Sequence, residues 1–123
     1  MIILVCGGRD YGKTLLEQDD FFTVLHRIDM ERGPIVRVVT GGARGADSLA
    51  EYWAKGKNID TATYPAEWGK YGKKAGPIRN RDMLKNEDIQ LVVAFPGGDG
   101  TADMVHAALT KGIEVMRINE KKY

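Results

Sequence analysis

The amino-acid sequence predicts an α/β fold, a three-layer Rossmann-like sandwich around a five-stranded parallel sheet. Short apolar runs rich in β-branched residues alternate with segments of helical periodicity along the whole chain. The runs are nearly continuous in apolar residues, which is typical of parallel strands that helices cover on both faces. Crossovers between parallel strands are right-handed. For a sheet of the Rossmann-like class we expect the strand order 3-2-1-4-5.

Five apolar runs are the expected strands. The first contains the only cysteine, Cys6, for which we expect a buried and inert thiol. No repeat or linker divides the chain, so residues 1–123 are expected to form one domain. The expected strands are residues 2–6, 35–39, 59–64, 90–95 and 114–118.

Helix signals fill the first two intervals between these runs. Thr14 and Glu17 form a capping box, and the helical periodicity that follows ends at Gly33, before a proline. A second helix is expected to begin at Asp47 and to end at Gly56. The residues expected to face inward from these two helices are Phe22, Leu25, Ile28, Leu49, Ala50, Trp53 and Ala54.

The last two intervals also predict helices. Pro77, at a first-turn position, opens a third helix that runs to about Glu87. Thr101 is the expected N-cap of a fourth helix, which ends at Gly112. The inward residues of this fourth helix are expected to be Val105, Ala108 and Leu109.

Composition and charge fit a globular protein and exclude several classes. Of the 123 residues, 43% are hydrophobic and 28% are charged, and the net charge is +1. This balance gives no overall attraction to nucleic acids or anionic membranes, so any recognition of an anion must be local. The first apolar run is short and has no cationic leader, so we expect a cytoplasmic protein without a membrane partner.

Glycines gather directly after the first, second and fourth expected strands. The carboxyl ends of parallel strands share one edge of the sheet, and ligands bind there, where the strand order reverses. Glycine loops before helix N-termini expose backbone N–H groups to an anion, so a phosphate is the expected guest. Each loop could also be only a tight turn, but three such loops on one edge favour a ligand site. These glycines are Gly7, Gly8, Gly41, Gly42, Gly45, Gly97, Gly98 and Gly100.

The segment 7–14 also matches the P-loop pattern G-x-x-x-x-G-K-[ST] between a strand and a helix. A P-loop NTPase is therefore an alternative. No later strand ends in an acidic residue that would hold Mg²⁺, and the interior of the loop is bulky. Both features disfavour the NTPase.

Three segments, 41–47, 76–83 and 96–104, resemble the YspA, YpsA-related branch of the SLOG superfamily. The resemblance spans nearly the whole chain. It implies a Rossmann-like binder of nucleotide ligands, related to the LOG phosphoribohydrolases and to the DNA-processing protein DprA, with many members in phages and prophages. Sensor and enzyme both remain open under this resemblance.

The resemblance to LOG enzymes implies a catalytic arginine at Arg79, but the position of the catalytic glutamate is occupied by Met104. Cleavage of an N-glycosidic bond needs a carboxylate, which methionine cannot supply. Asp103 is adjacent but lies about 100 degrees around the helix. Asp47 and Asp99 are possible substitutes, although Asp47 could instead be an N-cap or first-turn residue.

The loop after the third expected strand combines aromatic residues with lysines. Trp68 could stack on a base, while Lys70, Lys73 and Lys74 meet phosphates and the glycines let the loop close. The alternative is a solvated basic loop with Trp68 packed on the surface.

The leading interpretation is a module that senses or sequesters a nucleotide or nucleotide-derived phosphate, with no cofactor and no metal. A nucleotide N-glycosidic hydrolase that uses Arg79 is the alternative, followed by the P-loop NTPase and a binder of single-stranded DNA. The expected ligand-binding residues are Gly7, Gly8, Arg9, Gly41, Gly42, Arg44, Gly45, Asp47, Trp68, Arg79, Asn80, Pro96, Gly97, Gly98, Asp99, Gly100 and Thr101.

A homodimer is also expected. The resemblance to LOG-type proteins implies a dimer with its sites near the subunit interface, where a helix of one subunit could wall the pocket of the other. Two-fold dimers are also the commonest soluble oligomers. Four aromatic residues offer more apolar surface than the helices of one small domain would bury, although they could simply cover the sheet. They are Phe21, Phe22, Trp53 and Trp68.

Overall fold

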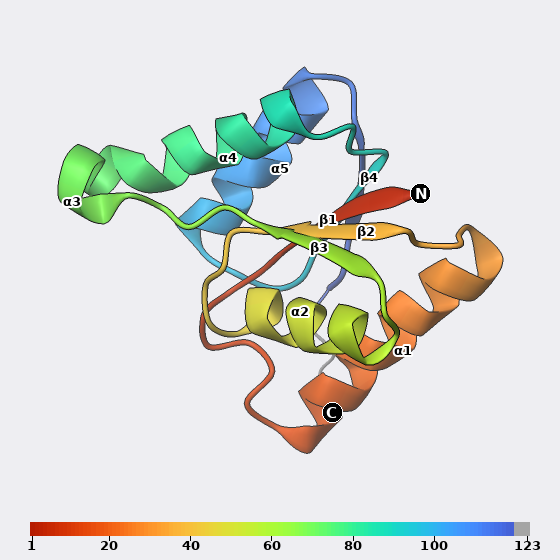
Figure 1. Ribbon diagram of the computed structural model, residues 1–123. Helices are drawn as coiled ribbons and strands as arrows, with labels where there is room; N and C mark the ends of the chain where they lie inside the picture. Colours follow the sequence, from red (N-terminus) through yellow and green to blue (C-terminus); the bar gives the residue numbers. More distant parts are fainter. Residues whose placement is uncertain (120–123) are drawn as a thin grey trace.

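The computed structural model describes residues 1–119, and its centre is one five-stranded parallel sheet (Figure 1). The strand order is β3-β2-β1-β4-β5, as the sequence predicts. Each observed strand lies within the expected run or, for β2, is displaced from it towards the C-terminus. The strands are β1 (Ile2–Cys6), β2 (Arg37–Thr40), β3 (Asp60–Thr63), β4 (Leu91–Ala94) and β5 (Glu114–Arg117).

Helices cover both faces of this sheet and complete the predicted three layers. Figure 1 shows α1 and α2 on one side and α4 and α5 on the other, with the short α3 projecting at one end. A 3₁₀ turn, η1, joins α3 to α4. The helical segments are α1 (Leu15–Glu31), α2 (Ala46–Gly56), α3 (Trp68–Tyr71), η1 (Gly72–Lys74), α4 (Ala75–Asn86) and α5 (Asp99–Thr110).

The register of the strands brings the glycine loops together. In the central strand β1, Leu4 pairs with Val39 of β2 on one side and with Val92 of β4 on the other. Because all strands run parallel, their carboxyl ends meet at one edge of the sheet. The segments after Cys6, Thr40 and Ala94 therefore converge, although they are far apart in the sequence.

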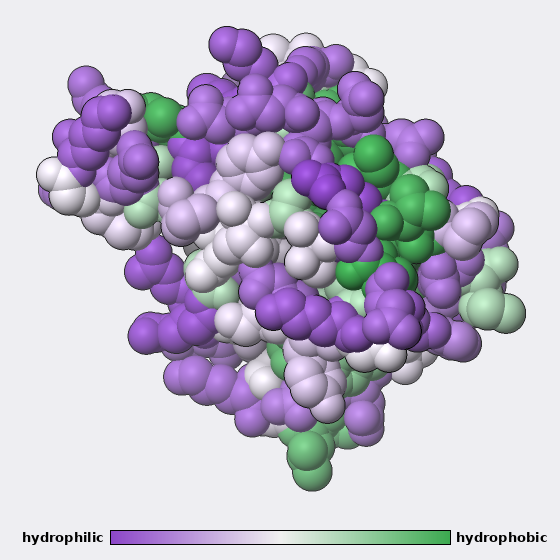
Figure 2. Space-filling view, viewed as in Figure 1, coloured by the Kyte–Doolittle hydropathy of each residue, from purple (hydrophilic) through white to green (hydrophobic). Residues whose placement is uncertain are grey.

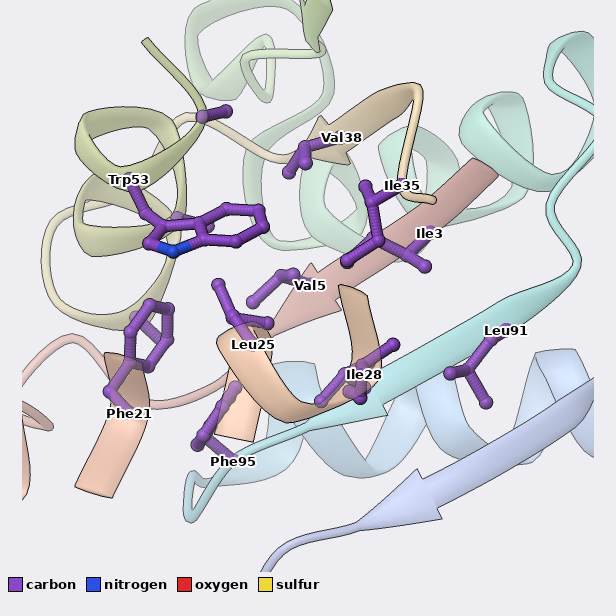
Figure 3. Packing of buried hydrophobic residues seen from close by; sticks show 14 residues of the cluster. Ile3, Val5, Phe21, Leu25, Ile28, Ile35, Val38, Trp53, Leu91 and Phe95 are labelled. Carbon is purple, nitrogen blue, oxygen red and sulfur yellow. The ribbon is translucent and has the colours of Figure 1, made fainter. Parts of the chain in front are cut away.

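Two apolar clusters, one on each face, hold the helices to the sheet. Alternate residues of β1 face opposite layers, so Val5 joins the cluster under α1 and α2, whereas Leu4 joins the one under α4 and α5. In the first cluster, the rings of Phe21 and Phe95 lie 4.4 Å apart between their centroids (Figure 3). Figure 3 also shows Trp53 of α2 turned towards the sheet. Burial on both faces explains why β1 and β4 are continuously apolar.

The helix ends agree with the sequence at α1 but differ at α5. Thr14 caps α1, because its Oγ1 accepts a hydrogen bond from the backbone N–H of Glu17 at 3.1 Å. The N-cap of α5 is Gly98 and not Thr101, which lies inside the first turn. Leu109 is 57% exposed and not inward, because it lies about 100 degrees around the helix from the buried Ala108.

The other differences are small. The helix expected to open at Pro77 is α4, which begins at Ala75, so Pro77 lies in its first turn as expected but does not open it. The loop expected to carry Trp68 contains the four-residue helix α3. Within residues 1–119, no helix is long and apolar enough to cross a membrane.

Candidate functional site

A hollow of about 480 Å³ lies where the glycine loops converge, within the size range of sites for small ligands. Its walls come from the loops after β1, β2 and β4, from the first half of α4 and from Trp68. We call it the edge hollow. The expected ligand-binding residues that line it are Gly7, Gly8, Arg9, Gly41, Asp47, Trp68, Arg79, Asn80, Gly98, Asp99, Gly100 and Thr101.

Five other expected residues lie outside the lining of the edge hollow. Gly42 and Arg44 border a smaller adjoining hollow of about 310 Å³, which shares Arg9, Trp68 and Arg79 with it. The exposed Arg44 guanidinium comes only within 3.9 Å of Asp10. The remaining three, Gly45, Pro96 and Gly97, lie behind the lining.

These three residues join the loops to one another. The backbone N–H of Gly8 donates to the carbonyl oxygen of Pro96 at 2.8 Å. A Cβ on Gly97 would lie 2.7 Å from the Gly8 nitrogen. Gly45, with φ of +82°, would place a Cβ 2.2 Å from the Gly8 oxygen. The tight-turn interpretation is therefore sufficient for Gly45 and Gly97, where close packing requires glycine.

Gly98 and Gly100 are different, because nothing in the described chain requires glycine there. A Cβ built on either residue meets no atom within 4 Å, and neither has a positive φ. Both line the edge hollow at the N-terminal end of α5. That end of the helix carries unpaired backbone N–H groups and a partial positive charge. The two glycines leave this polar backbone bare towards the hollow.

Arg79, from α4, is a fixed cation in the wall. Its Nη1 donates to the carbonyl oxygens of Gly41 at 2.7 Å and Tyr64 at 3.3 Å, and its Nε donates to Asn80 Oδ1 at 3.0 Å. A Cβ on Gly41 would lie 2.1 Å from Nη1, so glycine at 41 makes room for the guanidinium. Burial lowers the pKa of Arg79 and Asp47 opposes this effect, and the guanidinium remains charged at neutral pH.

Asp47 holds the second glycine loop in place. Its Oδ2 accepts hydrogen bonds from the backbone N–H groups of Gly41 at 3.1 Å and Ala43 at 3.2 Å. The side chain is only 6% exposed, and this burial raises its pKa to about 6, against the opposing effect of these hydrogen bonds and of Arg79. Asp47 is a first-turn residue, but the N-cap of α2 is Gly45.

A polar network ties α4 to the first turns of α5. Asn80 Nδ2 donates to the Gly100 carbonyl oxygen at 3.2 Å and to Asp103 Oδ2 at 3.0 Å. Arg81 Nη1 and Nη2 donate hydrogen bonds to the two oxygens of the same carboxylate, at 2.8 and 3.2 Å. These hydrogen bonds lower the pKa of Asp103. Asp103 lines the hollow, but its oxygens are already engaged by α4.

The carboxylate expected from the LOG resemblance has no equivalent at Met104, which is 1% exposed and packs in the cluster under α4 and α5. Asp99 also lines the edge hollow, and among residues 1–119 its side chain has no hydrogen-bond or ion-pair partner. Asp99 is thus the carboxylate with both oxygens available to a ligand or a water molecule.

Trp68 stands at the mouth of the edge hollow. Trp68 is 49% exposed, and the Arg9 guanidinium lies 5.5 Å from the centroid of its ring. Of the three lysines expected near this loop, Lys73 lines the hollow, whereas Lys70 and Lys74 do not. Figure 2 shows that the projecting lobe formed by α3 and the start of α4 is largely hydrophilic.

Cys6 was not expected in the site, but it lines the hollow as the last residue of β1. Desolvation raises the pKa of its thiol to about 12, so the sulfur stays protonated and weakly nucleophilic. Its position at a strand end is the signal that could have placed it in the wall. Cys6 was expected to be buried and inert: the residue is half-buried, and the raised pKa agrees with an inert thiol.

Only the first three residues of the P-loop pattern, Gly7, Gly8 and Arg9, line the edge hollow. Lys13, its central lysine, lies outside the lining and forms an exposed ion pair with Asp10 at 3.1 Å. Thr14, which would hold Mg²⁺ in a P-loop, caps α1. Residues 1–119 contain no group of three or more His, Cys, Asp or Glu side chains that could hold a metal ion.

Comparisons with known proteins agree with this architecture. Residues 1–71 match the model of the YspA, cpYpsA-related SLOG family. The Gene 61 protein of Mycobacterium phage D29 is 33% identical over 126 residues, which cover 97% of each chain. The X-ray structure of the structural-genomics target TM1055 superposes with a TM-score of 0.67 at 19% identity, over 94% of this chain and 72% of that one. This last likeness concerns the fold alone.

Proposed function

This chain belongs to the YspA, cpYpsA-related SLOG family, and we propose that it binds a nucleotide or nucleotide-derived phosphate in the edge hollow, as a sensor or sequestering module. The observation that carries the proposal is the pair of bare glycines, Gly98 and Gly100, at the N-terminal end of α5. Packing explains the other close-packed glycines of this edge but not these two. A ligand that approaches the backbone closely supplies a reason for them.

The phosphate end of the ligand belongs at α5. Backbone N–H groups and the helix dipole favour an anion there. Arg79, in the facing wall, adds a positive charge that its hydrogen bonds to Gly41 and Tyr64 hold in one position. A cation held in place loses little side-chain freedom when it meets a phosphate, which favours binding.

The base end of the ligand belongs at α3. Trp68 offers a half-exposed ring at the mouth of the hollow, and Arg9 already lies over that ring. A planar base can take the place of the guanidinium on the ring, or lie between the two groups. Lys73 lies on the same side of the hollow and would meet a further phosphate or a ribose hydroxyl.

Hydrolysis of the N-glycosidic bond is the second candidate, because Arg79 and Asp99 line one hollow. Asp99 would activate water or stabilise the sugar cation, as a carboxylate does in glycoside hydrolysis. The buried Met104 favours binding over hydrolysis. The pairing of Lys13 with Asp10 disfavours the NTPase, and the net charge of +1 disfavours single-stranded DNA.

The test is a calorimetric titration with AMP, GMP, CMP and UMP, with the four nucleosides and ribose 5-phosphate as partial ligands. We expect at least one mononucleotide to bind about tenfold more tightly than its nucleoside, as one charge-assisted phosphate contact implies. Lys73→Ala and Lys74→Ala form a matched pair, because both side chains belong to η1 and only Lys73 lines the hollow. Lys73→Ala should weaken binding and Lys74→Ala should not.

The same mixtures, analysed by mass, separate the two candidates. Intact nucleotide recovered after overnight incubation supports a binding module, whereas released base that disappears in Asp99→Asn supports the hydrolase. Equal affinity of nucleosides and nucleotides, or equal losses in the two lysine variants, would contradict a phosphate site in this hollow.

We also propose that the protein is a homodimer located in the cytoplasm. Three of the four aromatic residues no longer give a reason to expect a dimer, because Phe21 and Trp53 are buried within one chain and Phe22 is half-buried. Any homodimer must therefore use another surface. Sedimentation at micromolar concentration tests the dimer, which would have twice the 13.6 kDa of the chain.

A further inference from the structure

Helix α1 carries an outward surface that the proposed ligand site does not use. Its inward face is formed by Phe21, Leu25 and Ile28, which are buried against the sheet. Directly opposite on the helix lie Leu16, Thr23 and Met30, spaced seven residues apart and therefore on one face. Leu16 is 55% and Met30 71% exposed. Figure 2 shows apolar surface at the lower tip of the molecule, where α1 begins.

Charged residues flank the centre of this outward face with opposite signs. Asp19 lies four residues before Thr23, and Arg27 lies four residues after it. Among residues 1–119, Asp19 has no hydrogen-bond or ion-pair partner, and Arg27 has only an exposed contact with Glu31 at 3.9 Å. Such an exposed pair contributes little to stability, so both charges are available to a partner.

The outward face is complementary to itself. When the helix is turned end for end about Thr23, Leu16 takes the place of Met30, and Asp19 takes the place of Arg27. We infer that α1 is the contact face of a homodimer, in which two copies of α1 pack antiparallel across a two-fold axis at Thr23. Leu16 then packs on the partner's Met30, and Asp19 faces the partner's Arg27. This inference rests on the homodimer proposed above and names its surface.

A second copy of this chain fits the surface because of its charge order. An antiparallel copy brings acid to base at both ends of the contact, and a symmetric dimer requires this match twice. A hollow of about 600 Å³ between α1 and β5, with Val24, Met116 and Ile118 in its lining, flanks the face and extends the apolar contact. The 17 residues of α1 give a contact about 25 Å long.

The two ligand sites stay separate in this dimer, which differs from the arrangement that the resemblance to LOG-type proteins implies. Within the described part of the chain, no residue of α1 lines the edge hollow, so each site is complete in one protomer. Dimerisation and ligand binding can therefore be tested independently.

The experiment is a charge exchange, followed by sedimentation equilibrium from about 1 to 100 µM. We expect the parent chain to form a dimer, and Asp19→Arg or Arg27→Asp to raise the dimer dissociation constant about tenfold or more, because each substitution creates two repulsive contacts. The double variant Asp19→Arg/Arg27→Asp restores opposite charges and should return to within about threefold of the parent. All positions are exposed, and circular dichroism checks that each variant is folded.

A parent chain that stays monomeric at 100 µM would overturn the inference. A dimer that neither single substitution weakens, or that the double variant fails to restore, would place the contact elsewhere and overturn it equally. Titration with AMP, GMP, CMP and UMP separates this outcome from the ligand proposal. Loss of the dimer with unchanged mononucleotide binding per chain concerns α1 alone, and an intact dimer that binds none of the four mononucleotides concerns the edge hollow alone.

Discussion

Two groups of glycines at the same sheet edge have different physical causes. At Gly45 and Gly97, a Cβ would lie less than 3 Å from another loop, so these glycines let the loops approach. At Gly98 and Gly100, a Cβ would meet open space. In the sequence the two groups look alike. Only the surrounding atoms show which glycines allow two loops to pack closely and which leave backbone exposed to the hollow.

Gly45→Ala should have the largest effect on stability. The residue has φ of +82°, and the new Cβ would lie 2.2 Å from the Gly8 oxygen, an atom of another backbone segment. Strain and overlap together should cost about 3 kcal/mol or more of unfolding free energy. Gly56→Ala is the control, since nothing lies within 4 Å of a Cβ there. Urea unfolding measures both, and equal midpoints would remove the distinction between the two groups.

Asp47→Asn should change how the free energy of unfolding depends on pH, because burial raises the pKa of the Asp47 carboxyl group. Its pKa is about 6 in the folded chain, against an ordinary value of 3.8. Between these values the folded chain holds more protons than the unfolded chain, so the free energy of unfolding falls as the pH rises. Asp47 alone should remove roughly 3 kcal/mol between about pH 4 and pH 6.5.

Asparagine keeps an oxygen for the N–H groups of Gly41 and Ala43 but does not ionise in this range. Asp103, whose pKa is lowered by its hydrogen bonds to Arg81, changes stability in the opposite sense and is common to both proteins. The difference between parent and variant therefore isolates Asp47. Parallel pH profiles from urea unfolding would contradict the raised pKa.

Trp68→Ala should weaken nucleotide binding about tenfold, as the loss of one stacked base implies, with little effect on stability because the ring is half-exposed. Tyr71→Ala is the matched control, since Tyr71 also belongs to α3 but does not line the edge hollow. In a Trp53→Phe background, Trp68 is the remaining tryptophan and its fluorescence reports binding directly. A mononucleotide that binds without altering this fluorescence would refute stacking on Trp68.

Gly100→Ala should have the smallest effect on stability, and it sharpens the contrast with Gly45. Gly100 lies in the first turn of α5, where alanine is favoured over glycine by up to about 1 kcal/mol. We expect unchanged or slightly higher stability together with weaker nucleotide binding, because the added methyl covers backbone that faces the hollow. Thermal melts and calorimetry give the two readouts. Binding equal to that of the parent would mean that no ligand approaches this position closely.

The fold was predictable because its signals are local. Apolar runs, the Thr14 capping box and the alternation of strands and helices can all be read without tertiary contacts, and they indicated the Rossmann-like class. The strand order expected for that class is the observed one. The convergence of the glycine loops followed from that order. The homology-based position of Met104 also pointed to a missing carboxylate, and the residue lies in the core.

The details of the site depended on contacts that sequence patterns do not contain. Capping statistics suggested Thr101, but the N-cap is Gly98, and Thr101 lies in the first turn of α5, where its side chain packs so closely on Gly97 that a Cβ there would overlap with it. The hydrogen bonds of Asp47 to the preceding loop require the folded turn. The aromatic side chains gave a misleading reason for a dimer, because Phe21 and Trp53 fill the core of their own chain.

The parallel register that assembles the edge hollow also couples binding to the integrity of the whole chain. Its walls come from residues near 8, 41, 79 and 100, so no fragment of the sequence contains the site. A partly unfolded chain would lose its affinity at once. Any ligand of this hollow therefore stabilises every element of the fold together, by about 2.7 kcal/mol at a concentration 100 times its dissociation constant. In a cell, the amount of this protein that survives proteolysis would rise and fall with the concentration of its ligand.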